Sequence, residues 1–165
     1  MRAEIVITWK LFNSTFLGGV KLKKILTVLF TIMVLTACSE TINNDYKFVG
    51  ESEHWEAEYS YKGTEIWGED DGKRTYSNED SYEFVLKYKG SLEELSSIKK
   101  LEYSYKVNSL GESGTQEYTE PPRVVIISSK GSSKGGAKVG EDEVIKVNVN
   151  WDDFAESFEL HNKSK

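Results

Sequence analysis

The chain has 165 residues, with 21 Lys or Arg and 27 Asp or Glu, which give a net charge of −6. Residues 1–37 hold five of the basic residues and one of the acidic ones, so the remainder has 16 basic and 26 acidic side chains and a charge of −10. This balance argues against nucleic acid as a partner and against electrostatic binding of a polybasic segment to anionic lipid, because both depend on clustered Lys and Arg. The remaining length, about 128 residues, suits one domain with a single core.

A basic cluster followed by an apolar run stands near the start, in KLKKILTVLFTIMVLTACSE at 21–40. The apolar run at 25–35 is shorter than the roughly 20 residues that a membrane-spanning helix needs. Basic residues before a short apolar run are typical of a signal peptide. We therefore expect residues 1–37 to be a signal peptide. Residues 1–20 are interpreted as an over-extended gene start, with Leu22 as a TTG start codon.

The run ends in LTAC at 35–38, which resembles the lipobox of bacterial lipoproteins. The resemblance implies that the Cys38 sulfur receives a diacylglyceryl group, with fatty acids such as palmitate, and that the chain is cut just before Cys38. It also implies membrane lipid as a partner and the extracytoplasmic face of the cell membrane as the location. An ordinary signal peptide, or an uncleaved anchor with a chance cysteine, is the alternative. Cys38 is the single cysteine, which excludes an intramolecular disulfide.

The rest of the chain shows strand periodicity after a polar segment, 38–49, that is expected to be a lipidated tether. Apolar and polar residues alternate in WEAEYSYK (55–62), YEFVLKYK (82–89), LEYSYKV (101–107) and IKVNVNW (145–151). Such alternation predicts half-buried antiparallel strands. Shorter strands are expected at 64–68 and 123–127, and an Asp152-Asp153 turn predicts a C-terminal hairpin over 144–161. We therefore predict that residues 50–165 form an all-β, antiparallel, immunoglobulin-like β-sandwich, with a small β-barrel as the alternative.

Loops are expected where glycines and acids gather, at GEDDGKR (68–74), SLGESGTQ (109–116) and SSKGSSKGGAKVGED (128–142). FVGESEHWEAEY, LKYKG and DEVIKVNVNW followed by ESFEL are similar to segments of small Bacillus-type lipoproteins of uncharacterised function. That family favours Asn-Gly at the turn where this chain has Asp152-Asp153. The resemblance implies location and fold, and it brings no activity with it.

No catalytic constellation stands out, and no cofactor is expected. A Ser-His-Asp hydrolase would need a G-x-S-x-G elbow, which is missing, so the two histidines, His54 and His161, are expected at the surface or rim. GSSKGGAK at 131–138 is one change from a phosphate-binding loop, but Ala137 and the missing Ser or Thr after Lys138 favour a flexible loop.

No metal site is expected, since solvated acidic loops are common on so acidic a chain, but five acidic side chains are candidate calcium ligands. Glu69, Asp70, Asp71, Glu79 and Asp80 are oxygen donors of the kind that calcium prefers, although their spacing does not match an EF-hand loop. Most aromatic residues are expected in the core, and Trp67, beside the acidic loop, is the one most suited to a binding surface.

The function that these features favour is a non-enzymatic binding or interaction module that recognises a protein or an envelope component. An envelope hydrolase using carboxylates alone, or a structural lipoprotein without a discrete ligand, are the alternatives.

Overall fold

The computed structural model describes residues 39–108 and 110–163, which form eight strands. They are β1 (Glu40–Glu51), β2 (Trp55–Asp70), β3 (Lys73–Tyr88), β4 (Lys100–Val107), β5 (Leu110–Glu117), β6 (Ile126–Lys134), β7 (Ile145–Trp151) and β8 (Phe154–Asn162). Within these ranges no helix is long and apolar enough to cross a membrane. The expected signal peptide and Cys38 lie outside the described residues.

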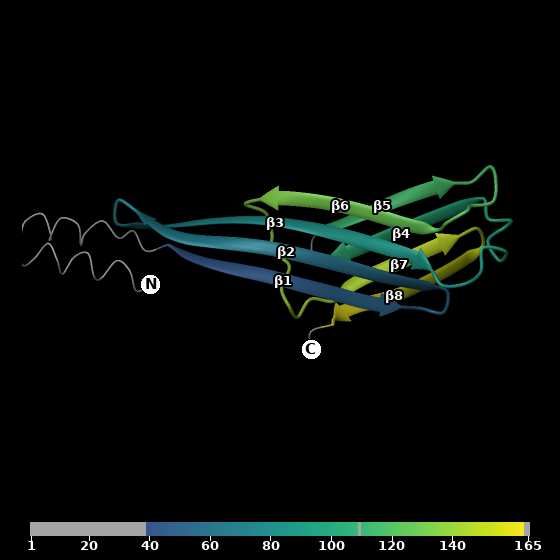
Figure 1. The fold of residues 1–165 in the computed structure, drawn as a ribbon, viewed down its shortest axis with the longest axis horizontal. Coiled ribbons are helices and arrows are strands. Elements are labelled where there is room, and N and C mark those ends of the chain that lie inside the picture. Colours follow the sequence, from purple (N-terminus) through teal and green to yellow (C-terminus); the bar gives the residue numbers. More distant parts are fainter. Residues whose placement is uncertain (1–38, 109, 164–165) are drawn as a thin grey trace, which may run out of the picture. The chain divides into compact units, whose positions relative to one another are not determined.

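All eight strands belong to one antiparallel sheet, in the order β5-β4-β7-β8-β1-β2-β3-β6. Figure 1 shows β1, β2, β3 and β6 in one layer, with β4, β5, β7 and β8 behind them. The layers are joined where β1 meets β8, through only two residue pairs, Phe48 with Asn162 and Val49 with His161. The sheet therefore curls into a half-barrel whose free edges are β5 and β6.

The prediction of an antiparallel all-β domain is thus confirmed. The finer prediction of two immunoglobulin-type sheets is not confirmed, because the short β1–β8 ladder joins both layers into a single sheet. The alternative, a small barrel, is only half realised, since β5 and β6 do not pair with each other among the described strands.

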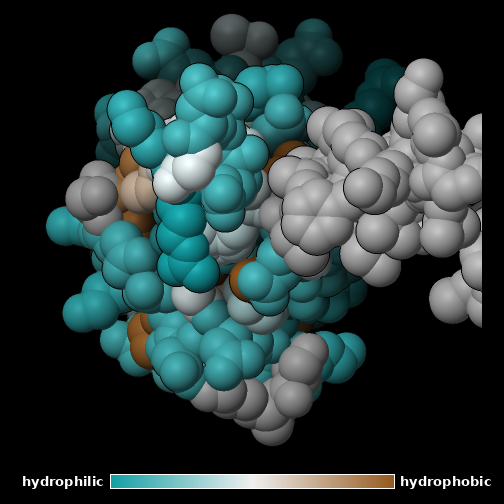
Figure 2. All heavy atoms as spheres, turned by 90° about the vertical axis from the view of Figure 1, so that its left-hand side faces the viewer, coloured by the Kyte–Doolittle hydropathy of each residue, from teal (hydrophilic) through white to brown (hydrophobic). Residues whose placement is uncertain are grey.

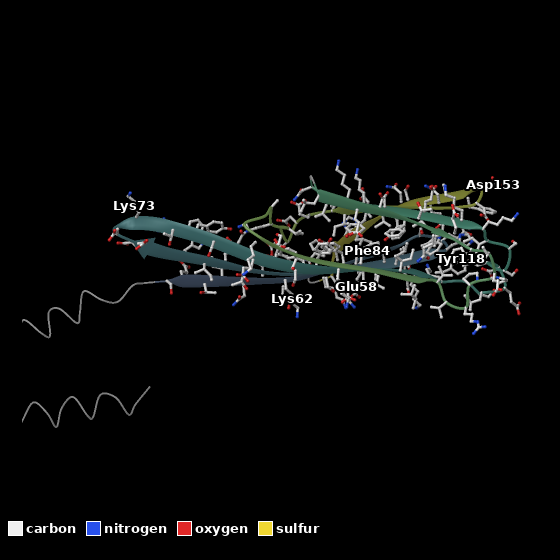
Figure 3. The ribbon with its side chains drawn as sticks, turned by 90° about the horizontal axis from the view of Figure 1, so that it is seen from above. Glu58, Lys62, Lys73, Phe84, Tyr118 and Asp153 are labelled. Atoms are coloured by element: carbon white, nitrogen blue, oxygen red, sulfur yellow. The ribbon has the colours of Figure 1, made fainter. Side chains whose placement is uncertain are left out.

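The core fills the space between the two layers. Trp55 and Phe84 from the front layer are fully buried, and Phe84 stacks on Tyr105 of the back layer with ring centroids 4.2 Å apart. The labelled Phe84 lies between the layers in Figure 3. Fully buried partners from both layers complete the core: Phe48, Leu86, Leu101, Ile145, Val147, Val149 and Leu160. Each such side chain contributes about 1.5–3 kcal/mol, so packing across the interior holds the halves together.

The β2–β3 hairpin extends beyond strands β4 to β8 as an arm, seen at the left of Figure 1. Its two-residue turn, Asp71-Gly72, has positive φ at both positions, 49° and 72°. Asp-Gly favours this conformation, so residues 68–74, expected as a loop, are strand ends around a tight turn. The first half of β1 runs along the arm, with Glu40 opposite Trp67.

The expected tether, residues 38–49, therefore differs from the structure, because strand β1 begins already at Glu40. Most side chains in the first half of β1 are exposed, since the arm extends past the main core. A strand in that position does not need apolar alternation, which is why its sequence resembles a linker.

The predicted C-terminal hairpin is confirmed, with Trp151 opposite Phe154 across a two-residue turn. Asp152 in this turn has a positive φ of 48°. Its carboxylate accepts hydrogen bonds from the backbone N–H groups of Lys99 and Lys100, at 3.1 and 3.0 Å. The side chain thus ties the hairpin to the start of β4, a contact that explains an Asp at this turn.

Candidate functional site

A cavity of about 350 Å³ lies at the open side of the half-barrel, between the edge strands β5 and β6. We name it the edge cleft. Its wall is formed by Tyr59, Tyr61, Asp80, Tyr82, Tyr105 and Glu112, completed by small residues of β6 and the loop that follows it. The volume is within the range of pockets that hold small ligands.

Glu112 is the hydrogen-bonding centre of the edge cleft. Its Oε2 accepts hydrogen bonds from the hydroxyls of Tyr105, Ser129 and Tyr82, at 2.8, 2.6 and 3.3 Å. These three donors belong to β4, β6 and β3, so one carboxylate oxygen connects strands from both layers. No described side chain donates to the other oxygen, Oε1, which leaves it able to accept from a ligand.

The electrostatics of the cleft keep this carboxylate charged. The hydrogen bond from Ser129 lowers the pKa of Glu112, and Tyr105 and Tyr82 add to the effect against the opposing influence of burial. Burial raises the pKa of Tyr105 well above its ordinary value, so its hydroxyl remains a donor. Neither Glu112 nor Asp80 forms an ion pair with any described Lys, Arg or His. The cleft is therefore anionic and aromatic at neutral pH.

Sequence reasoning missed Glu112, because residues 109–116 were expected to be a loop. The structure places Leu110–Glu117 in β5, an edge strand whose inward positions after Leu110 are not apolar. Glu112 lies opposite Tyr105 and shares its face, and the next inward position is Gly114 beneath the ring of Tyr103. The feature that could have predicted β5 is a short hairpin, because only two residues separate Val107 at the end of β4 from Leu110 at the start of β5.

The candidate calcium ligands do not converge on one ion. Asp70 lies opposite Lys73 at the tip of the arm, whereas Asp80 lies opposite Gly63, seven residues back along β2. At the rise of a strand this is a separation of about 23 Å. Glu79 forms an ion pair with Lys134 at 2.7 Å, and Asp80 accepts a hydrogen bond from Ser133 at 3.0 Å.

The two histidines occupy separate positions. His161 is exposed near the end of β8, while His54, in the β1–β2 turn, hydrogen-bonds Glu156 of β8 through Nδ1 at 2.5 Å. His54, Glu156 and the neighbouring Glu53 place three possible metal ligand atoms within 4.8 Å of one another. Since the Nδ1 of His54 is already bound to the Glu156 carboxylate, the described geometry is that of a clip between the turn and β8.

Hydrogen bonding sets the charge of this clip. The hydrogen bond to Glu156 raises the pKa of His54, although partial burial opposes the shift. Burial alone would raise the pKa of Glu156, but hydrogen bonds from Ser52 and His54 hold it below the usual value. The ring of His54 also stacks on Tyr88, with centroids 6.2 Å apart.

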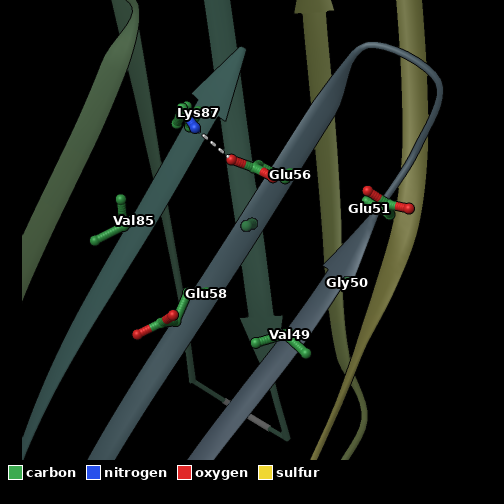
Figure 4. Close-up of a pocket in the computed structure, with 8 residues that line it drawn as sticks. Val49, Gly50, Glu51, Glu56, Glu58, Val85 and Lys87 are labelled. Carbon is green, nitrogen blue, oxygen red and sulfur yellow. Dashed lines mark hydrogen bonds and ion pairs between the residues drawn. The ribbon is translucent and has the colours of Figure 1, made fainter. Parts of the chain in front are cut away.

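A second depression, of about 650 Å³, lies on the outer face of β1, β2 and β3 (Figure 4). Val49 and Val85 lie among three acids, Glu51, Glu56 and Glu58. Each acid is paired with a lysine: Lys89–Glu51 at 2.9 Å, Lys87–Glu56 at 2.8 Å and Lys47–Glu58 at 2.8 Å. These charges are paired within the protein, so the depression offers a ligand mainly apolar contact with the two valines.

The segment that resembles a phosphate-binding loop has a structural role. The Nζ of Lys138 lies 2.8 Å from the carboxylate of Glu65 on the arm, which lowers the pKa of Glu65. Tyr76 also donates to Glu65, at 3.3 Å, and its ring packs against Trp67 with centroids 4.5 Å apart.

The side chain of Trp67 on the arm is 38% exposed. Figure 2 shows the molecule from the arm's side, where the coloured surface is mostly hydrophilic and apolar patches are small.

Comparisons with family models, with curated proteins and with solved structures find no match to this chain. The candidate site therefore rests on its own geometry. Cys38, the expected site of lipid attachment, lies outside the described residues, one position before Ser39.

Proposed function

We propose that this protein is a lipid-anchored, extracytoplasmic lipoprotein that acts as a non-enzymatic binding module, with the edge cleft as its binding site. The anchor is the diacylglyceryl group on Cys38, supported by the basic cluster, the short apolar run and LTAC in that order. Attachment through two acyl chains needs no basic patch, which agrees with an acidic domain.

The observation behind the binding role is Glu112. A half-buried, charged carboxylate with one unsatisfied oxygen lies in a cavity between two edge strands that are each paired on one side only. The second oxygen of this carboxylate stays accessible, since the indole nitrogen of Trp55 is the only buried side-chain polar atom without a partner among the described residues. A charged donor on a ligand can bond to this oxygen, and hydrogen bonds to charged groups are the stronger ones, so the arrangement favours binding.

A carboxylate hydrolase is the second candidate, because Glu112 and Asp80 both line the edge cleft. Glycoside hydrolysis with two carboxylates needs one of them as a general acid with a raised pKa. The hydrogen bonds from Ser129, Tyr105 and Tyr82 act in the opposite direction on the pKa of Glu112. We therefore favour binding over hydrolysis, and a structural lipoprotein without a ligand is the remaining alternative.

Site-specific photo-crosslinking in intact cells tests this proposal. A photoreactive residue replaces Leu110, which lines the cleft and is 49% exposed, and the control replaces Phe154, which is 65% exposed at the start of β8. We expect one reproducible crosslinked product from position 110 and not from position 154. The product should be lost in Cys38→Ala, which should also leave the membrane fraction and take up no labelled fatty acid.

Equal crosslinking from both positions would refute the edge cleft as the binding site. Fatty-acid labelling that persists in Cys38→Ala would refute the anchor. Crosslinking that continues in a correctly processed but unanchored form would show that binding does not require the membrane.

A further inference from the structure

We infer that the edge cleft recognises an aliphatic ammonium group, as found in a small amine or on a lysine side chain. The inference rests on the proposed binding function and names the chemistry of its ligand. It follows from the charge of the cleft, the free oxygen of Glu112 and the aromatic wall.

The charge of the cleft is negative and uncompensated. Its lining contains two acids, Asp80 and Glu112, and no basic residue. Lys138 lies next to the lining, but its ammonium group is bound to Glu65. The depression on the outer face is different, because a lysine of the protein neutralises each of its three acids. The edge cleft therefore lacks the cation that the other acidic hollow already has.

The hydrogen bonding of Glu112 favours a donor of positive charge. Its Oε2 is saturated by three hydroxyls, and these donors hold the carboxylate in place across the gap between β5 and β6. The remaining oxygen, Oε1, is a hydrogen-bond acceptor. An ammonium N–H makes a shorter and stronger bond to a carboxylate than a neutral hydroxyl does. Anionic ligands are excluded, since two carboxylates would repel them.

The tyrosines add affinity for a cation. Tyr59 and Tyr82 stack at 5.4 Å, and Tyr59 is tilted against Tyr105 at 5.8 Å, so three rings form one side of the cavity. Tyr59 and Tyr105 are buried, so a bound ammonium group meets chiefly the partly buried ring of Tyr82, whose quadrupole attracts it. Leu110 and Val139 supply apolar lining for the methylene chain that carries the ammonium. A cavity of about 350 Å³ accommodates such a chain but is too small for a folded partner.

Calorimetric titration of the folded domain with n-butylammonium tests the inference, with 1-butanol as the uncharged probe of matched length. We expect saturable binding of butylammonium in the millimolar range, as is usual for so small a ligand, and little binding of 1-butanol. Nα-acetyl-lysine methylamide is titrated in parallel. Tighter binding of this probe identifies a lysine side chain as the source of the ammonium, and tighter binding of butylammonium identifies a free amine.

Glu112→Gln should weaken the binding of butylammonium about tenfold or more, the loss expected for one hydrogen bond to a charged group. The control, Glu117→Gln, makes the same charge change on the same strand outside the cleft and should bind like the wild type. Asp80→Asn serves as a second cleft variant if Glu112→Gln does not fold.

Equal affinity for 1-butanol, unchanged affinity in folded Glu112→Gln or Asp80→Asn, or no saturation in the wild type would each overturn the ammonium assignment. If crosslinking at position 110 nevertheless occurs in cells, the binding module stands and only its ligand chemistry is wrong. If crosslinking and titration both fail, the binding function itself falls.

Discussion

The hydrogen bond between Tyr105 and Glu112 should stabilise the fold measurably, because it joins β4 to β5 inside the edge cleft. Tyr105 is only 4% exposed, and its hydroxyl donates to Glu112 at 2.8 Å. In Glu112→Ala this hydroxyl loses its charged acceptor and keeps only the neighbouring hydroxyls of Tyr82 and Ser129, at a cost of about 1–3 kcal/mol. Ser129 and Tyr82 lie nearer the opening and can turn to water, so we expect a total loss of about 2–3 kcal/mol.

A double-mutant cycle isolates this contact from the other two. Tyr105→Phe removes the donor and should cost about 1–1.5 kcal/mol in the free energy of unfolding, measured by urea denaturation at pH 7. In the Tyr105→Phe background, Glu112→Ala should cost about 1–2 kcal/mol less than in the wild type, because the hydroxyl that loses its charged acceptor is already gone. Losses that add to within about 0.3 kcal/mol would show that the bond is not formed.

The acid limb of the stability curve provides a check on the same carboxylate. The pKa of Glu112 is lowered in the folded state, chiefly by Ser129, so its contribution is fully present above the unfolded pKa of about 4.3. That contribution is lost as the pH falls through the folded pKa. The stability difference between the wild type and Glu112→Gln should therefore be constant near neutral pH and shrink in acid. A difference that grows in acid would refute the assignment.

Two further outcomes are expected. The pKa of His54 is raised in the folded state, so its contribution to the free energy of unfolding is fully present below the unfolded pKa of about 6.5 and is lost as the pH rises through the folded pKa. Glu156→Gln should therefore flatten the pH dependence of stability in this range. An unchanged pH dependence would contradict the hydrogen bond between His54 and Glu156. Gly131→Ala should destabilise by about 1–3 kcal/mol, since its Cβ would lie 2.6 Å from the ring of Tyr82, whereas Gly140→Ala, whose nearest neighbours are 3.7 Å away, should be close to neutral in thermal unfolding.

Strand periodicity was sufficient to predict the interior strands, because their inward positions face a core. The alternation of Ile145, Val147, Val149 and Trp151 predicts β7, and all four are buried. The same signal fails at the edges and on the arm. In β5 the inward positions that follow Leu110 are a glutamate and a glycine, and in the first half of β1 only Ile42 is apolar, so no apolar residue recurs at every second position.

The edge cleft could not be derived from the sequence for a related reason. The curl of the sheet places the two edge strands, β5 and β6, opposite each other, and only this brings Glu112 close to Tyr82 and Ser129. That curl depends on the two-residue ladder between β1 and β8, which leaves no periodic trace in the sequence. The alternation predicts these tyrosines as core residues. It does not show that the hydroxyls of Tyr82 and Tyr105 donate to Glu112.

The position of Glu112 also links binding to stability. A free edge strand invites pairing with other chains, and the hydrogen bond from Ser129 on β6 to Glu112 on β5 fixes the distance between the two edges of this sheet. A cation bound at Oε1 would neutralise the carboxylate without removing its three hydroxyl partners, so ligand binding and closure of the half-barrel reinforce each other. Saturating butylammonium should then raise the melting temperature of the wild type, as linkage requires for a ligand of the folded state, and should not raise that of Glu112→Gln. An equal rise in both proteins would place the bound amine elsewhere on this acidic surface.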